Sequence, residues 1–136
     1  MTSFAAIENK ISSVRKYLGI LERYKKYSRE EIDSSIDLRG ALERYLYLVI
    51  QATIDLAEAV ISYKNIRKPS TLSESFVILE EAGIIPSKLM ESMVRMTGFR
   101  NVVAHDYEEL DYDVVLDILH SNLPEIEEFS KKVGNL

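Results

Sequence analysis

The stretch from Leu42 to Ile61, LERYLYLVIQATIDLAEAVI, contains neither glycine nor proline, and its apolar residues recur with helical spacing. One seam consists of Leu42, Leu46, Val49, Thr53, Leu56 and Val60. A second seam consists of Tyr45, Ile50, Ile54, Ala57 and Ile61. Apolar residues at such intervals line one side of an α-helix. The stretch therefore predicts a long helix that is apolar on two sides.

A helix with two apolar sides can bury them in two ways. If a small monomeric bundle cannot bury both seams, one seam packs inward and the other meets a partner subunit, because a large exposed apolar face marks an interface. Alternatively, the helix lies at the centre of the bundle and helices of the same chain cover both seams. The sequence leaves both interpretations open.

A further helix is predicted on the N-terminal side of this stretch. Its apolar stripe, over about residues 3–26, consists of Phe4, Ile7, Ile11, Val14, Leu18 and Leu21. Ser28 and Glu31 then form the capping-box pattern S-x-x-E, which predicts the start of the next helix. Because nothing before Pro69 compels a stop, that helix is expected to run from Ser28 to about Lys64.

A short third helix is predicted after a linker at Pro69 and Ser70. Thr71 and Glu74 repeat the capping-box pattern, which indicates where this helix begins. Gly83 is suited to the left-handed conformation that ends many helices.

The remaining residues predict two more helices. Pro86 can open a fourth helix at its first turn, and the apolar pattern extends to about Val103. Asp111 is expected to cap a fifth helix, which Pro124 kinks or restarts. No useful strand-like alternation and no internal repeat is present. The predicted fold class is all-α, an antiparallel bundle of about five helices in one domain, residues 1–136.

Composition excludes several classes of protein. There is no cysteine, so disulfides, thiolate nucleophiles and cysteine-based metal sites are ruled out. No uninterrupted apolar run approaches the roughly 18 residues of a membrane span, and the first ten residues carry charges where a signal peptide would be apolar. A cytoplasmic location without membrane contact is the expectation that remains.

Charge is distributed unevenly along the chain, whose net charge is −5. Residues 1–68 carry 12 basic and 9 acidic side chains, net +3, whereas residues 69–136 carry 5 and 13, net −8. The acidic balance argues against a protein that coats nucleic acid nonspecifically. The densest basic cluster is Lys16, Arg23, Lys25, Lys26 and Arg29. This basic cluster is either a solvated helix face or a source of phosphate contacts.

One short stretch, Phe99 to Tyr107 (FRNVVAHDY), places an arginine, a histidine and a tyrosine close together. On a continuous helix the five positions from Arg100 to His105 rotate the side chain by about 140°, so the two would not share a face. Arg100 and His105 can therefore act together only if the helix ends or loosens near Ala104. The other interpretation is a histidine that stabilises a helix C-terminus by its charge.

Two segments resemble the HEPN-domain toxins of the HepT type. One is STLSESFVILEEAGIIPSKLMESMVRMTGFRNVVAHDYEELDYDVV, from Ser70 to Val115, and the other is the stretch from Leu42 to Ile61. The signature of this family is an arginine, four residues, a histidine, one residue and a tyrosine. Arg100, His105 and Tyr107 match it, so the likeness covers most of the chain and is weakest in the first helix.

The resemblance implies a metal-independent endoribonuclease, the toxin of a type VII-like toxin–antitoxin pair, that needs no cofactor. The ribose 2′-hydroxyl would attack the adjacent phosphate, with His105 suited to proton transfer and Arg100 to stabilising the charge that develops. Asn101 and Asp106 are candidates for orienting these two groups. The resemblance also implies that a cognate minimal nucleotidyltransferase (MNT) antitoxin adenylylates Tyr107 and so silences the nuclease.

Base and acid catalysis call for two proton-transfer groups, but the motif supplies one histidine. His120, the only other histidine, is expected to be structural or exposed. A symmetric homodimer would bring two copies of Arg100 and His105 to one cleft, as in HEPN proteins, and the second seam of the long helix could supply its interface. The alternative is a non-catalytic, nucleotide-binding helical partner of a nucleotidyltransferase. The intact Arg-x4-His-x-Tyr motif favours the nuclease over this alternative, and the acidic balance of the chain is the main argument against the nuclease.

Overall fold

The computed structural model describes residues 3–105 and 110–136, and every regular element in these ranges is helical. The elements are α1 (Phe4–Glu22), the 3₁₀ turn η1 (Arg23–Lys26), α2 (Arg29–Asp33), α3 (Ile36–Tyr63), α4 (Glu74–Glu81), α5 (Ser87–His105), α6 (Tyr112–Asp117), the π-helical turn η3 (Ile118–Asn122) and α7 (Leu123–Gly134). Five of these helices, α1, α3, α4, α5 and α7, have eight residues or more. The predicted all-α antiparallel bundle is confirmed.

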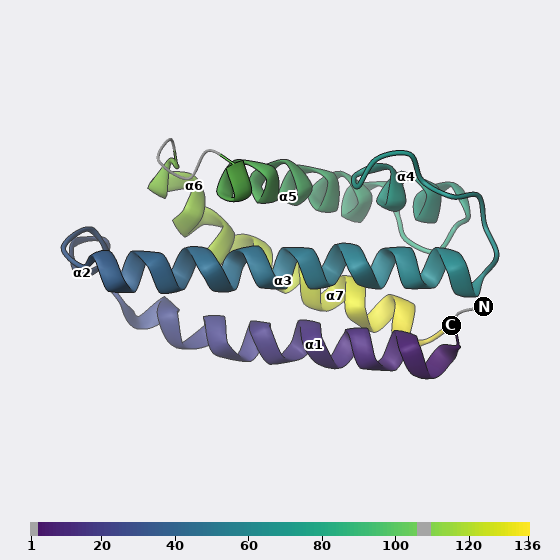
Figure 1. Ribbon diagram of the computed structural model, residues 1–136, viewed down its shortest axis with the longest axis horizontal. Helices are drawn as coiled ribbons and strands as arrows, with labels where there is room; N and C mark the ends of the chain where they lie inside the picture. The colour runs from purple at the N-terminus through teal and green to yellow at the C-terminus, as the bar shows by residue number, and fades with distance from the viewer. Residues whose placement is uncertain (1–2, 106–109) are drawn as a thin grey trace.

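The helix α3 is the central element of the bundle. Figure 1 shows α1 and α5 along opposite sides of α3, and α3 also contacts α4 and α7. All six residues of the first seam are buried, and so are four of the five in the second, from Ile50 to Ile61; Tyr45 alone is half-buried. The central-helix interpretation is therefore correct. The second seam cannot supply a dimer interface, because it is already covered within the chain.

By length and composition alone, α3 would also pass as a membrane span, contrary to the expectation from sequence. However, 56% of its most apolar window is buried inside the bundle. A core helix has the same composition for a different reason, since its apolar faces pack against neighbouring helices.

Aromatic and sulfur-containing side chains join the outer helices around α3. Phe76 of α4 and Phe129 of α7 meet edge to face, with ring centroids 5.4 Å apart and an interplanar angle of 71°. Met93 and Met96 of α5 are buried in the same core. Each such side chain contributes roughly 1.5–3 kcal/mol when it is fully buried.

The predicted continuous helix from residue 28 to about 64 is wrong at Ser34 and Ser35. The capping box is present, because the Ser28 hydroxyl accepts from the Glu31 N–H at 3.1 Å and the Glu31 carboxylate accepts from the Ser28 N–H at 3.0 Å. The helix that it opens, α2, nevertheless ends at Asp33. The Ser34 hydroxyl donates to a carbonyl of α2 at 3.1 Å, and the Ser35 hydroxyl accepts from the Leu38 N–H at 3.1 Å and so starts α3. Serine side chains compete in this way with the hydrogen bonds of a continuous helix.

Other helix ends agree more closely with the predictions. Gly83 has φ of +75°, the left-handed conformation expected after α4. Asp111 caps α6 by accepting from the Asp113 N–H at 2.9 Å. Pro124 lies in the first turn of α7, and the backbone runs helically from α6 through the π-helical turn into α7 without a break. The predicted first helix, by contrast, stops being α-helical at Glu22 and ends in the 3₁₀ turn.

The C-terminal part of α5 is less deeply buried than the rest of the helix. Phe99 is the last buried side chain among those that the structure describes in this helix, and the side chains from Arg100 to Ala104 are half-buried or exposed. This part of α5 points toward the end of the molecule where α6 and α2 lie (Figure 1).

Candidate functional site

Arg100 lies at this end of α5, and its guanidinium group is fixed by three hydrogen bonds. Nε donates to the Gln51 side-chain oxygen at 2.9 Å. One terminal nitrogen donates to Asn101 Oδ1 at 3.0 Å, and the other donates to the Tyr47 hydroxyl at 3.3 Å. Each of the three nitrogens has a partner of its own, so the plane of the guanidinium group is set before any ligand arrives.

A guanidinium group has five N–H donors, and these contacts use three of them. One N–H on each terminal nitrogen has no partner among the residues that the structure describes. Arg100 also has no carboxylate partner within that part of the chain. Its charge and two of its donors therefore remain for an anion.

Tyr47 of α3 lies close to two cations. The guanidinium carbon of Arg100 is 5.2 Å from the centre of its ring, and that of Arg44 is 5.9 Å away. The electron-rich face of a tyrosine attracts a guanidinium group at such distances. Tyr47 thus holds two positive charges at one place on the surface of α3.

Two residues that contact Arg100, Tyr47 and Gln51, belong to a polar strip along α3 that also contains Arg44 and Asp55. Gln51 joins the strip together, since its oxygen accepts from Arg100 and its nitrogen donates to Asp55 Oδ1 at 2.9 Å. Sequence reasoning missed these residues. Their spacings of three, four and four positions, which place them on one side of the helix, were the signal that could have revealed them.

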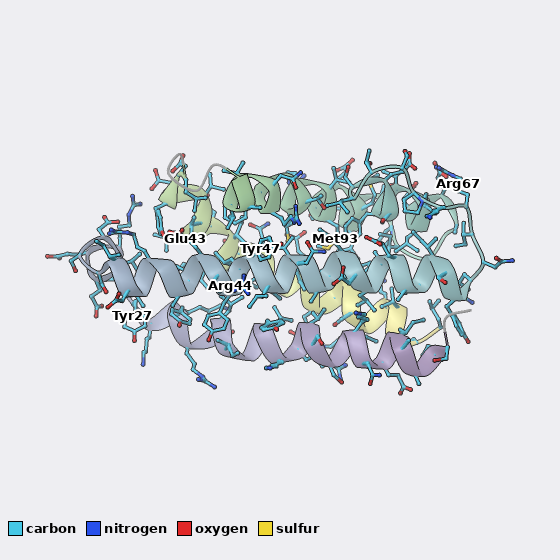
Figure 2. All side chains as sticks on the ribbon, in the orientation of Figure 1. Tyr27, Glu43, Arg44, Tyr47, Arg67 and Met93 are labelled. Atoms are coloured by element: carbon cyan, nitrogen blue, oxygen red, sulfur yellow. The ribbon has the colours of Figure 1, made fainter. Side chains whose placement is uncertain are left out.

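An open hollow of about 380 Å³ lies beside this strip and is lined by Gly40, Glu43, Arg44, Tyr47, Val103 and Ala104. We call it the Arg44 hollow. It is formed by α3 and by the last turns of α5, immediately before His105 in the sequence. Figure 2 marks Glu43, Arg44 and Tyr47 along α3.

The predicted site residues are only partly within the described chain. Arg100 and Asn101 are in contact, as the predicted orienting role of Asn101 requires. His105 is the last described residue of α5, and the residues that follow it lie outside the described chain, so the expected end of the helix near Ala104 stays a prediction. The side chain of His105, and both Asp106 and Tyr107, lie outside the described residues.

The chain that resumes after these residues is attached to the wall of the Arg44 hollow. The Tyr112 hydroxyl of α6 donates a hydrogen bond to Glu43 of α3. Burial, followed by this contact with Glu43, raises the pKa of Tyr112 well above its ordinary value. Asp113 accepts from Arg29 of α2 at 2.5 Å, and Arg29 also pairs with Asp33 at 3.1 Å. These contacts hold the start of α6 against α2 and α3.

Most side chains of the basic cluster around η1 form ion pairs or ring contacts with neighbouring residues. Lys25 pairs with Glu22 at 2.9 Å, and Arg29 has the two acidic partners described above. Lys16 and Lys26 each lie over the ring of the tyrosine that follows them. These contacts favour the solvated-face interpretation of the cluster. His120 is exposed in η3, which agrees with the expectation for it.

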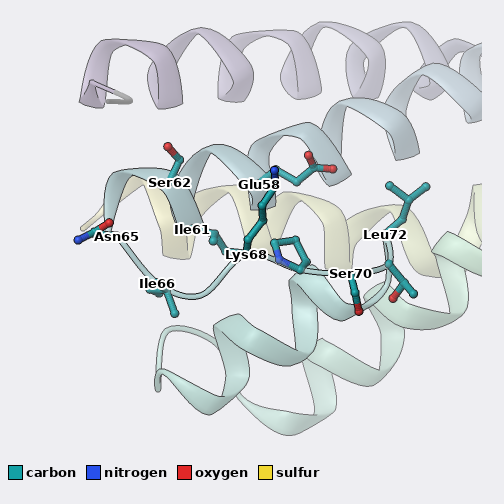
Figure 3. Close-up of a pocket in the computed structure, with 10 residues that line it drawn as sticks. Glu58, Ile61, Ser62, Asn65, Ile66, Lys68, Ser70 and Leu72 are labelled. Carbon is teal, nitrogen blue, oxygen red and sulfur yellow. The ribbon is translucent and has the colours of Figure 1, made fainter.

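A larger hollow, of about 560 Å³, lies at the other end of α3 (Figure 3). Its walls come from the C-terminal turns of α3 and from the connection to α4, and include Glu58, Ile61 and Leu72. Burial, and then the charge of Asp55, raise the pKa of Glu58. Ten residues of helix, or about 15 Å, separate Gln51 from Ile61, so this hollow is not part of the Arg100 site. Among the described residues no group of three or more potential ligands could hold a metal ion.

Known proteins are similar to this chain in sequence and in fold. Residues 14–133 match the family model described as ribonuclease HepT-like. The mRNA nuclease HepT of Shewanella oneidensis is 27% identical over 90% of this chain and 92% of its own length. The tRNA nuclease HepT of Aphanizomenon flos-aquae is 29% identical over 77% of this chain and 71% of its own.

A solved structure extends the likeness to the fold. The tri-AMPylated HEPN toxin of Shewanella oneidensis, in complex with MNT antitoxin, superposes with a TM-score of 0.88 at 23% identity, over 96% of this chain and 97% of that one. The endoribonuclease class predicted from sequence agrees with the family description and with the names of both nucleases. The family match covers most of the sequence, from the second half of α1 to the end of α7. The chain therefore belongs to the ribonuclease HepT-like family, as its Arg-x4-His-x-Tyr motif predicted.

Proposed function

We propose that this chain is the endoribonuclease toxin of a toxin–antitoxin pair and that Arg100 and His105 carry its chemistry. Two related nucleases cut mRNA and tRNA according to their names, and a related HEPN toxin forms a complex with an MNT antitoxin. The observation that carries the proposal is the Arg100 guanidinium group. It is oriented by Tyr47, Gln51 and Asn101, yet it keeps two N–H donors without a partner in the described chain.

Such an arginine suits a phosphodiester that is being cleaved. In the proposed reaction the 2′-oxygen bonds to the adjacent phosphorus as its proton is removed, and the bond from phosphorus to the 5′-oxygen breaks as that oxygen gains a proton. The products are a 2′,3′-cyclic phosphate and a 5′-hydroxyl. Arg100 donates to the non-bridging oxygens, where charge develops in the transition state. A guanidinium group held in place beforehand needs no reorganisation at that moment.

His105 supplies the proton transfers, because the ordinary pKa of an imidazole lies near 6.5. The motif supplies one histidine, which leaves one of the two transfers unassigned. We therefore propose a symmetric homodimer with two copies of the motif in one cleft, whose interface lies outside the second seam of α3. Asn101 orients Arg100, and Asp106 is proposed to fix the tautomer of His105.

Regulation is proposed to act on Tyr107. The related HEPN toxin carries three AMP groups in its complex with the MNT antitoxin. An adenylyl group on Tyr107, two residues from His105, would add negative charge and bulk where the RNA phosphate must bind. A toxin of this kind works in the cytoplasm, where both its RNA substrate and its antitoxin are found.

The decisive experiment is cleavage of end-labelled RNA by the purified protein in the presence of EDTA, compared with Arg100→Ala and His105→Ala. We expect cleavage by the unmodified protein, products ending in 2′,3′-cyclic phosphate, and a loss of at least 100-fold in both variants. Circular dichroism and thermal melting check that both variants fold.

Two results would contradict the proposal. Cleavage that persists in both variants would assign the activity elsewhere. RNA or nucleotide binding without cleavage would favour the alternative, a non-catalytic partner of a nucleotidyltransferase that uses Arg100 to bind phosphate.

A further inference from the structure

Arg44 is a cation whose charge no contact in the described chain neutralises. It is exposed, and the ring of Tyr47 is the one contact found for its guanidinium group among the described residues. The carboxylate next to it in sequence, Glu43, instead accepts the hydroxyl of Tyr112. By contrast, Arg29 and Arg67 each pair with two carboxylates.

Arg44 and Arg100 are held on the same tyrosine although their charges repel each other. Their guanidinium carbons are 5.9 and 5.2 Å from the centre of the Tyr47 ring. The ring offsets part of the repulsion. An anion bound between or beside them would remove the remainder, so this pair is suited to a ligand with more than one negative charge.

The Arg44 hollow gives such a ligand room next to the cations. It measures about 380 Å³ and is bounded by α3 and by Val103 and Ala104 at the end of α5. The wall at Gly40 is open, since a β-carbon built there would meet no heavy atom within 4 Å. No described atom therefore obstructs the surface directly over Gly40.

We propose that the Arg44 hollow is a subsite for RNA and that Arg44 binds the phosphate next to the scissile one. The inference rests on the proposed function, because Arg100 is taken to hold the scissile phosphate. Tyr47 is then a positioning residue that sets the separation of the two guanidinium groups. Besides Arg44, the wall side chains with polar atoms are Glu43 and Tyr47, and both have hydrogen-bond partners in the described chain, so the subsite recognises the backbone rather than the base.

Binding is tested without cleavage in the His105→Ala background, with a fluorescently labelled single-stranded RNA as the probe. We expect Arg44→Gln to raise Kd by about 10-fold at low salt, as the loss of one phosphate contact does. The slope of log Kd against log salt should fall by about 0.7, the value for one phosphate of a single strand. Arg15→Gln removes an exposed cation of α1 that has no partner among the described residues, and it should change neither quantity.

A second pair of variants tests the subsite without altering Arg44. Gly40→Glu places a carboxylate in the wall of the hollow, where no atom obstructs it, and should also raise Kd about 10-fold. Gly19→Glu is the matched control, because Gly19 is equally open and lies on α1, across α3 from α5 (Figure 1). Equal binding by Gly40→Glu and Gly19→Glu would overturn the inference.

Steady-state kinetics of RNA cleavage tests the Arg44 subsite separately from the nuclease activity on which the inference rests. In the His105-containing protein Arg44→Gln should raise KM about 10-fold and change kcat little, because the contact forms in both the bound RNA and the transition state. Active protein whose KM does not respond to Arg44→Gln refutes the subsite and leaves the nuclease intact. Inactive protein whose RNA affinity still depends on Arg44 refutes the nuclease and supports the subsite.

Discussion

The guanidinium group of Arg100 is positioned by two side chains of α3 that precede it by 49 and 53 residues, Gln51 and Tyr47. Both contacts are polar, and neither side chain is exposed enough to move freely. At the scale of single residues, the site is therefore an arginine of α5 and its supports on α3.

The hydroxyl of Tyr47 gives the first prediction. Tyr47→Phe keeps the ring beside both guanidinium groups but removes the acceptor of one Arg100 N–H, worth about 0.5–1.5 kcal/mol. We expect kcat/KM for RNA cleavage to fall about 3- to 10-fold, with little change in the melting temperature. Tyr63→Phe at the far end of α3 is the control and should leave kcat/KM unchanged. A normal rate in Tyr47→Phe would mean that the hydroxyl does not orient Arg100.

Replacing Arg100 by lysine gives the second prediction. An ammonium group has three N–H donors, so it cannot satisfy three protein contacts and also donate to two phosphate oxygens. We expect Arg100→Lys to lower kcat by about 100-fold or more while the protein stays folded. Single-turnover cleavage measures the effect. Near-normal kcat would show that only the positive charge matters.

The motif residues were predictable from sequence and their supports were not, for a physical reason. Arg100 and His105 are recognised by local spacing, which sequence displays directly. Gln51 becomes part of the site only when α5 packs along α3. The packing of the core decides which residues of the two helices lie opposite each other. The polar strip on α3 could have been noticed in the sequence, but the sequence does not show that Arg100 contacts it.

At the scale of helices, the ends depend on side-chain hydrogen bonds. The capping box at Ser28 was predictable because both of its partners lie within four residues. The break between α2 and α3 was not, because Ser34 and Ser35 are tolerated inside helices as well as at their ends. The pattern of apolar residues thus predicted which helices exist better than it predicted where each one stops.

The connection between α3 and α4 gives the third prediction, which concerns pH. The Glu74 carboxylate accepts from the Ser70 backbone N–H at 2.9 Å, and this hydrogen bond, with those from the Ser70 hydroxyl and Arg67, lowers the pKa of Glu74 below 4.5. A carboxyl group with a lowered pKa in the folded protein stabilises the fold above its ordinary pKa. The stabilisation is lost as pH falls through the lowered value.

We therefore expect Glu74→Gln to destabilise the protein at pH 7 and to differ less from the unmodified protein as the pH falls below about 4. Urea unfolding at several pH values measures the difference. Glu91→Gln, at an exposed position of α5 without a partner in the described residues, should show no such dependence. A pH-independent difference for Glu74→Gln would mean that the ionised carboxylate contributes nothing.

At the scale of the whole molecule, the burial of both seams of α3 restricts how two copies can associate. Ile50, Ile54 and Ile61 are at most 4% exposed within one chain, so separation of the chains would not uncover them. A dimer must instead use the outer surfaces of the bundle, and the composite-site hypothesis requires that surface to lie near the end of α5.

Mixed dimers give the fourth prediction. Two differently tagged copies, one carrying His105→Ala, can be co-expressed and purified through both tags. If each cleavage needs a histidine from both chains, the mixed dimer should retain only a few per cent of the activity of the unmodified dimer. Half of that activity would instead indicate two independent protomers.

The absence of buried side chains from Arg100 to Ala104 has a consequence for amide hydrogen exchange. The hydrogen bonds that close the last turns of α5 can open locally, because little apolar area is uncovered when they do. Amide protons of residues 101–104 should therefore exchange with deuterium much sooner than those of residues 93–99, which lie in the part of α5 that carries Met93, Met96 and Phe99. RNA held by Arg100 should slow that exchange, so deuterium uptake at these few amides would report occupancy even in a protein that cannot cut.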